Sequence, residues 1–142
     1  MSNIVPADRY EAAADLQVIT CFFNPARYRT KRENYERFMA PLRAGGVPTL
    51  TVECAFGNDE FELPPGPEVL HVRGASVMFQ KERLLNLALP HLQPSCAKVA
   101  WLDADVLFDR ADWVLAASEA LDRYVVIQPF EHCYRLPRGS FS

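Results

Sequence analysis

The chain of 142 residues is long enough for one domain with a substantial core, and its 49% hydrophobic content is typical of globular proteins and argues against disorder. Its formal net charge of -3, from 15 basic and 18 acidic residues, gives no electrostatic reason to expect nucleic acid or an anionic membrane as a partner. No run approaches the roughly 20 apolar residues of a membrane-spanning helix, and the start of the chain lacks the basic and apolar regions of a signal peptide.

The cysteines are spread along the chain without C-x-x-C spacing. They are Cys21, Cys54, Cys96 and Cys133. This spacing indicates neither a zinc site nor a thioredoxin-like redox motif. We therefore expect four free thiols and a cytoplasmic location.

The first third of the chain predicts a strand followed by a helix. Residues 16–23 (LQVITCFF) are rich in β-forming side chains and end at an Asn-Pro turn signal. From 30 to 43, apolar residues recur at helical spacing among charged ones, and two glycines follow as a C-terminal cap. Pro41 is expected to kink or shorten this helix.

The middle of the chain predicts two strands and a second helix. Residues 49–56 (TLTVECAF) form a strand, and a proline-rich loop separates it from a short strand at 69–72. Residues 80–89 read as a helix that ends before Pro90. Its inward side is expected to carry Leu84, Leu87 and Ala88.

The last third predicts a strand, a helix and a final strand. The strand covers 98–108 (KVAWLDADVLF), Asp109 would cap a helix over 111–121, and YVVIQPF forms a strand at 124–130. Strands that alternate with helices favour an α/β domain whose mostly parallel sheet is covered on both faces. Ligands of such sheets bind outside the carboxyl ends of the strands.

Two carboxylates interrupt the apolar run WLDADVLF. Side chains two apart on a strand point the same way, about 7 Å apart, so Asp103 and Asp105 would present two negative charges on one face. At an effective dielectric constant near 20 their repulsion is roughly 2 to 3 kcal/mol, and a cation would remove it. Carboxylate oxygens suit Mg²⁺ or Mn²⁺, which are commonly held together with substrate phosphates. The pair therefore predicts a metal–nucleotide site at the end of a strand.

An apolar strand ending in Asp-x-Asp, preceded by the helix KERLLNLAL, resembles the donor-binding half of GT-A glycosyltransferases of the family-2 type. The resemblance covers residues 16–130, with 1–15 as an N-terminal segment and 131–142 as a tail. It implies a three-layer α/β/α domain, here incomplete, that binds a UDP- or GDP-linked sugar for transfer to an unknown acceptor. Divalent Mn²⁺ or Mg²⁺ would be the cofactor.

The resemblance also implies roles for individual residues around the donor. Asp105 would coordinate the metal that bridges the two phosphates, and Asp103 would lie near the ribose and the metal, with roles that partly exchange. The implied donor-binding residues are Phe23, Asn24, Pro25, Glu53, Lys81, Arg83, Asn86 and Asp103. Glu53 stands where an aspartate is common, and either Lys81 or Arg83 would meet base or phosphate. No catalytic base is assigned.

Three alternatives stay open at this point. The aspartates can be a plain polar strand end, and the basic residues of the second helix a solvated face. DADVL also resembles the first motif of haloacid dehalogenase-like phosphatases, although that motif ordinarily stands near the chain start. A nucleotide-sugar-binding module or fragment without turnover is the third, because the acceptor half of a GT-A enzyme is not seen.

Overall fold

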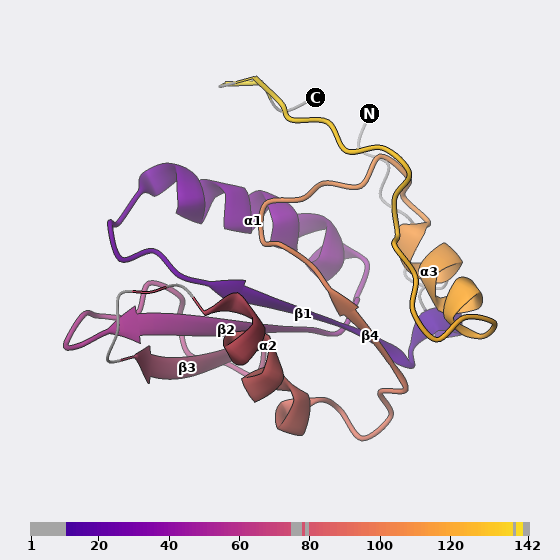
Figure 1. Ribbon diagram of the computed structural model, residues 1–142, viewed down its shortest axis with the longest axis horizontal. Helices are drawn as coiled ribbons and strands as arrows, with labels where there is room; N and C mark the ends of the chain where they lie inside the picture. Colours follow the sequence, from indigo (N-terminus) through magenta and orange to yellow (C-terminus); the bar gives the residue numbers. More distant parts are fainter. Residues whose placement is uncertain (1–10, 75–77, 79, 138, 141–142) are drawn as a thin grey trace.

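The computed structural model describes residues 11–74, 78, 80–137 and 139–140, so the first ten residues of the expected N-terminal segment lie outside it. It is an α/β structure with a four-stranded parallel sheet and three α-helices (Figure 1). The elements in chain order are η2 (Glu11–Ala13), β1 (Leu16–Phe22), α1 (Arg29–Ala44), β2 (Thr49–Phe56), β3 (Val69–Gly74), α2 (Lys81–Ala88), η3 (Leu89–His91), β4 (Lys98–Trp101) and α3 (Trp113–Leu121). No described helix is long and apolar enough to span a membrane.

The sheet has the strand order β3-β2-β1-β4, and all of its pairings are parallel. Val18 pairs with Thr49 of β2 on one side of β1 and with Ala100 of β4 on the other. The chain therefore builds outward from β1 in one direction through β2 and β3, then crosses back to place β4 on the opposite side. The strand order reverses between β1 and β4.

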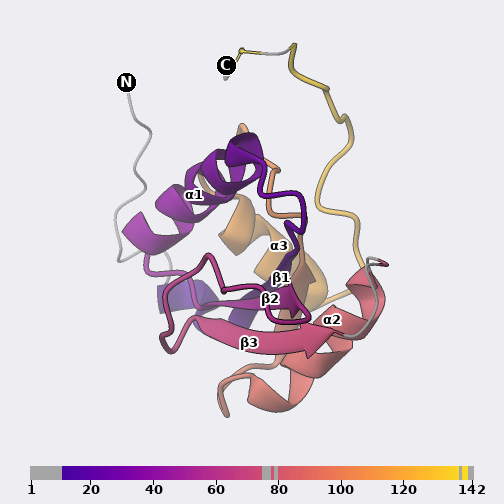
Figure 2. The same ribbon diagram turned by 90° about the vertical axis from the view of Figure 1, so that its left-hand side faces the viewer.

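Helices cover both faces of the sheet because each face carries its own apolar cluster. Figure 2 shows α1 and α2 on opposite sides of the strands. The cluster beneath α1 and α3 contains Leu16, Val18, Phe22, Tyr35, Phe38, Met39, Leu42, Leu102, Val114 and Ala117 among its buried residues. The cluster beneath α2 contains Ile19, Leu50, Val52, Leu84, Leu85 and Ala88. Full burial of one large apolar side chain contributes about 1.5–3 kcal/mol, so these clusters are the main source of stability.

Two expectations about helix interiors are corrected. Helix α1 runs through Pro41 to its end at Ala44, so the expected shortening is wrong; the proline lies on the exposed side of the last turn, where it removes one hydrogen bond. In α2, Leu87 is 41% exposed and Leu85 only 1%. Several leucines lie side by side in this helix, and its seating on the sheet selects the stripe that contains Leu85.

The strand expected at 98–108 is shorter, and the helix after it begins later. Strand β4 ends at Trp101, and the residues from 102 to 110 are irregular. Asp112, not Asp109, precedes the first turn of α3, and its carboxylate is held by the two-pronged guanidinium of Arg110 (2.9 and 2.8 Å) instead of capping the helix. Trp101 is 50% exposed because it lies at the end of an edge strand.

The strand expected at 124–130 is absent, because these residues are irregular and do not join the sheet. Val125 and Val126 are 97% and 83% exposed, whereas Ile127 packs against the cluster beneath α1 and α3. A segment with high β-propensity forms a strand only when a partner strand takes its hydrogen bonds.

Lys98 ties the start of β4 to two other elements. Its ammonium donates to the hydroxyl of Ser118 in α3 at 2.9 Å and lies 3.1 Å from Asp15 and 2.6 Å from Asp122. The hydrogen bond with Asp122 is the main cause that raises the pKa of Lys98. The lysine side chain is 13% exposed, so these carboxylates replace most of its water.

We expect Lys98→Met to lower the free energy of unfolding by about 1–2 kcal/mol, because the aliphatic stem is kept while Asp15 and Asp122 lose their shared cation. Arg123→Met is the matched control, since it removes a basic group next to Asp122 that takes part in no ion pair of the described chain. Urea denaturation of both variants measures the difference. Equal stability of the two would contradict the role assigned to Lys98.

Candidate functional site

The carboxyl ends of β1 and β4 meet where the strand order reverses, which is the place where open parallel sheets bind ligands. Leu102 fixes the chain after β4 to this point. Its N–H donates to the carbonyl of Ile19 (3.1 Å), and its own carbonyl accepts a bond from the Thr20 hydroxyl (2.7 Å). The exposed Asp103 therefore lies directly beside the end of β1.

Asp103 and Asp105 are exposed, and they do not share the face of a strand as the sequence predicted. Strand β4 has already ended, and a turn at 104–105 follows, with the N–H of Val106 3.4 Å from the carbonyl of Asp103. Water around both carboxylates thus lowers the free-energy cost of the two charges and weakens the repulsion that a shared strand face would have imposed. Within the described chain, Asp105 takes part in no ion pair.

Lys81 and Asp103 form an ion pair between the first residue of α2 and the segment after β4. The lysine side chain is 34% and the aspartate 55% exposed, so water screens the pair and its contribution to stability is small. The hydrogen bond to Asp103 is the main cause that raises the pKa of Lys81. The ammonium is therefore charged at neutral pH, and its charge is lost as the pH rises past the raised pKa.

A second ammonium and a thiol lie near this pair. Lys31, at the start of α1, donates to the carbonyl of Phe23 at 2.6 Å. Burial raises the pKa of the Cys21 thiol to about 11, while the charges of Lys81 and Lys31 act to lower it and that of Asp103 to raise it. Both ammoniums thus act on the end of β1. The sequence analysis missed Lys31, although a first helical turn without acidic residues is an unusual arrangement for a helix N-terminus.

The loop after β1 uses its polar groups internally. Asn24 is 6% exposed, and its amide donates to the carbonyl of Tyr28 (3.1 Å) and accepts from the N–H of Tyr28 (3.0 Å), which fixes the turn before α1. Phe23 is buried in the protein, and Pro25 is exposed. Of these three residues expected to bind the sugar donor, Asn24 and Pro25 line a small pocket near the ends of β1 and β2.

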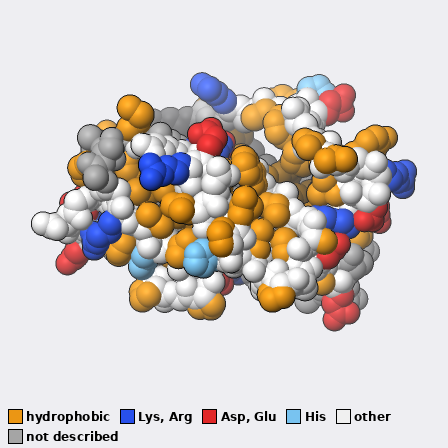
Figure 3. All heavy atoms as spheres, turned by 60° about the horizontal axis from the view of Figure 1, so that its bottom comes forward, with side chains coloured by type: hydrophobic (Ala, Val, Ile, Leu, Met, Phe, Trp, Pro, Cys, Tyr) orange, Lys and Arg blue, Asp and Glu red, His pale blue; other side chains and the backbone are white. Residues whose placement is uncertain are grey.

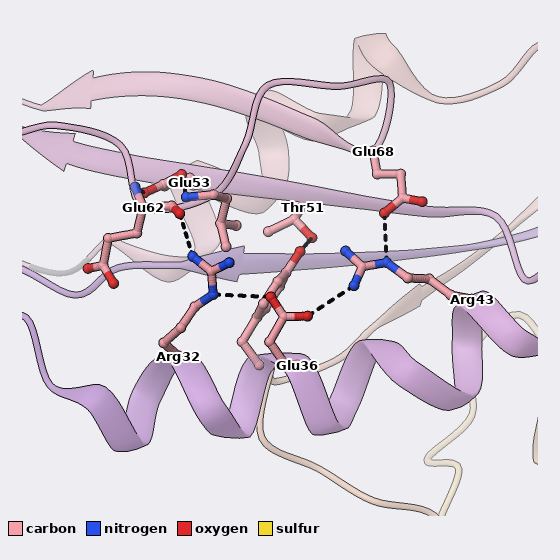
Figure 4. Close-up of polar contacts among 9 residues, drawn as sticks. Arg32, Glu36, Arg43, Thr51, Glu53, Glu62 and Glu68 are labelled. Carbon is pink, nitrogen blue, oxygen red and sulfur yellow. Dashed lines mark hydrogen bonds and ion pairs between the residues drawn. The ribbon is translucent and has the colours of Figure 1, made fainter.

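Glu53 is a structural carboxylate inside β2, level with Phe22 at the end of β1 and three residues before β2 ends. It is 3% exposed and accepts the N–H groups of Glu62 (2.6 Å) and Leu63 (2.9 Å), with His71 Nε2 at 3.3 Å. Figure 4 shows it beside the loop that Arg32 also contacts from α1, through a hydrogen bond to the carbonyl of Glu62. Both carboxylate oxygens are engaged, so Glu53 holds the loop between β2 and β3.

The remaining basic and amide residues expected at the site stand apart from the Lys81–Asp103 pair. Arg83 is exposed and hydrogen-bonds Gln80 at 3.3 Å, one turn back along the start of α2. Asn86 is exposed, and no hydrogen bond of its side chain falls within the described residues. Of these two basic residues, Lys81 contacts the segment after β4, whereas Arg83 contacts its own helix start.

The donor set at this edge suits a divalent ion only together with a ligand. Within the described ranges, no group of three or more His, Cys, Asp or Glu side chains is arranged to hold a metal ion. Asp103 and Asp105 supply carboxylate oxygens on one short segment, and Mg²⁺ is typically bound by one or two carboxylates plus phosphates and water. The two residues therefore fit part of such a shell.

We expect Glu53→Gln to lower the free energy of unfolding by about 1–3 kcal/mol, because the amide NH₂ would face a backbone N–H where a carboxylate oxygen now accepts. Hydrogen exchange at the amides of Glu62 and Leu63 should accelerate. Glu60→Gln, an exposed change in the same loop, is the control and should alter neither quantity. Unchanged exchange in the Glu53 variant would show that the carboxylate does not hold the loop.

Comparison with known proteins gives no relative from which a function can be transferred. No protein-family model matches the chain, no curated protein is significantly similar to it, and no solved structure matches it.

Proposed function

We propose that the edge formed by β1 and β4 binds a nucleotide-diphosphate sugar with Mn²⁺ or Mg²⁺, as the donor-binding half of a glycosyltransferase with a three-layer, GT-A-like fold. One observation carries the proposal. Lys81 and Asp103, 22 residues apart in sequence, meet where the strand order reverses, and Asp105 follows two residues later.

The ion pair provides a way to receive a diphosphate. A phosphate oxygen takes the place of the Asp103 carboxylate at the ammonium of Lys81, which is an exchange of one anion for another at a partly exposed site. The released carboxylate then stands with Asp105 on the same segment. Both are available to a divalent cation that also binds the phosphates.

Two further residues favour a dianionic ligand here. Lys31 adds a second positive charge near the end of β1. Cys21 adds no negative charge at neutral pH, because its pKa of about 11 keeps the thiol protonated. The end of β1 is thus flanked by one ammonium from the start of α1 and one from the start of α2, and the carboxylate oxygens lie on the segment after β4.

In this proposal Asp105 and Asp103 would hold the metal, which would supply Lewis-acid stabilisation to a departing diphosphate. The chain's own residues orient the phosphates: Lys81 by a charge-assisted hydrogen bond, and Leu102 by fixing the segment that carries the aspartates. A binding module without turnover needs the same residues. Release of free sugar from UDP- or GDP-sugars, measured with Mn²⁺, separates an active transferase from such a module.

We expect UDP or GDP to bind measurably by calorimetry in the presence of Mn²⁺ and at least tenfold more weakly without it, a difference of about 1.4 kcal/mol. Asp105→Ala should remove this dependence on metal. Asp109→Ala is the control, because it deletes another exposed carboxylate of the same irregular segment. Equal heats for wild type and Asp105→Ala would defeat the proposal.

We expect Lys81→Met to weaken nucleotide-diphosphate binding about tenfold, because the phosphate loses a charge-assisted hydrogen bond. Arg83→Met, two residues along the same helix, should change the affinity less than about twofold, since its guanidinium is directed to Gln80. The same titrations measure both. A larger loss in the Arg83 variant would transfer the phosphate contact to that residue.

A further inference from the structure

Strand β4 leaves one edge of the sheet open within the described chain. The N–H groups of Lys98 and Leu102 donate to carbonyls in and just before β1, at 3.0 and 3.1 Å. Backbone groups of successive strand residues alternate in direction, so those of Val99 and Trp101 face outward. The opposite edge, β3, carries the exposed Arg73, a charge that discourages strand addition, whereas the only charge of β4 is neutralised by carboxylates.

Residues 124–130 (YVVIQPF) have the composition of a strand and no partner strand. Their backbone begins with the N–H of Tyr124 bonded to the carbonyl of Ala120 (2.9 Å), and no backbone hydrogen bond joins 125–130 to another part of the described chain. Val125 and Val126 are almost fully exposed. Two adjacent β-branched residues in this state lose both their packing and their hydrogen-bonded neighbours.

The segment does not fit the open edge of its own chain as a parallel strand. Helix α1 leads from β1 to β2, and α3 packs in the same cluster as α1, on the same face of the sheet. A strand outside β4 would lie in the opposite direction from β2, so the crossover through α3 would have the opposite hand to the crossover through α1. Since about 98% of such crossovers are right-handed, both cannot have the preferred hand. The end of α3 lies beside the start of β4, where Asp122 pairs with Lys98. An antiparallel strand would have to begin at the other end of β4, which the two residues between α3 and Tyr124 are too short to reach.

Exposed apolar side chains are concentrated on this part of the chain. Of the twelve large hydrophobic residues that are exposed in the described structure, eight lie between 101 and 136. They are Trp101, Leu107, Tyr124, Val125, Val126, Phe130, Tyr134 and Leu136. Figure 3 shows apolar side chains at the surface on its right-hand side, where α3 and the following chain lie in Figure 1. The exposed apolar residues of the described structure are thus concentrated in the stretch of sequence that contains the unpaired segment.

We propose that residues 124–130 of one copy add to the β4 edge of a second copy, and reciprocally, to form a two-fold symmetric dimer. Within the described chain, the β4 edge has no neighbouring strand and residues 124–130 pair with no strand, so each copy supplies what the other lacks. Pairing gives hydrogen-bond partners to Val99 and Trp101 and covers Val125 and Val126. The inference stands independently of the nucleotide site.

Light scattering after size exclusion tests the dimer over about a hundredfold range of concentration. The wild type should approach twice the chain mass of 16.1 kDa as the concentration rises. Val126→Pro should remain monomeric, because proline lacks the N–H that the ladder needs. Val126→Thr keeps the N–H and the β-branch, and should dimerise. Because Val126 is 83% exposed, both variants should keep the fold, which circular dichroism checks.

The controls distinguish strand addition from other association. Leu89→Lys, at an exposed position outside this region, should leave the dimer intact. Pro129 has no N–H and suits the outward-facing positions, so Val126 and Gln128 would face the ladder. Hydrogen exchange should show protection of the amides of Val126, Gln128, Val99 and Trp101 only at dimer-forming concentrations. A wild type that stays monomeric, a dimer that survives Val126→Pro, or protection in the monomer would each overturn the proposal.

Discussion

The pairing of β1 with strands on both of its sides is the constraint on which the rest of the structure depends. Because β2 and β4 flank β1 in parallel, the carboxyl ends of strands that are far apart in sequence come to one edge of the sheet. The apolar residues of β1 belong to both clusters, so a one-residue change in its register would move each of them to the opposite face and disrupt the packing of both clusters. This strand carries Cys21, whose thiol is acted on by the charges of Lys31, Lys81 and Asp103.

Local patterns were sufficient where one element type dominated a segment. Strand β2 has the bounds expected from its alternating β-formers, and α1 lies where helical spacing placed it, so the α/β class with a parallel sheet follows from the sequence. The patterns failed after Trp101, because WLDADVLF and YVVIQPF carry β-propensity without a pairing partner. Whether such a run becomes a strand is decided by the hand of the crossover and the occupancy of the edge, which are properties of the whole fold.

Residue type alone also did not separate site from scaffold. Phe23 and Asn24 follow the end of β1, and Glu53 lies level with that end inside β2, yet Glu53 and Asn24 hold loops and Phe23 is buried in the core. A carboxylate with two backbone donors looks the same in a sequence as one that faces solvent. Asp103, Asp105 and Lys81 differ from these scaffold residues, because Asp103 and Lys81 contact each other and Asp105 is exposed to water.

Leu102 gives the two aspartates unequal freedom. The N–H and the carbonyl of Leu102 are both hydrogen-bonded to β1, so Asp103 follows directly after a fixed residue. The backbone at Asp103 is thus fixed relative to the sheet, whereas Asp105 is separated from that point by a turn. The Thr20 hydroxyl, which is fully buried and meets no solvent, sets this difference from the interior of the protein.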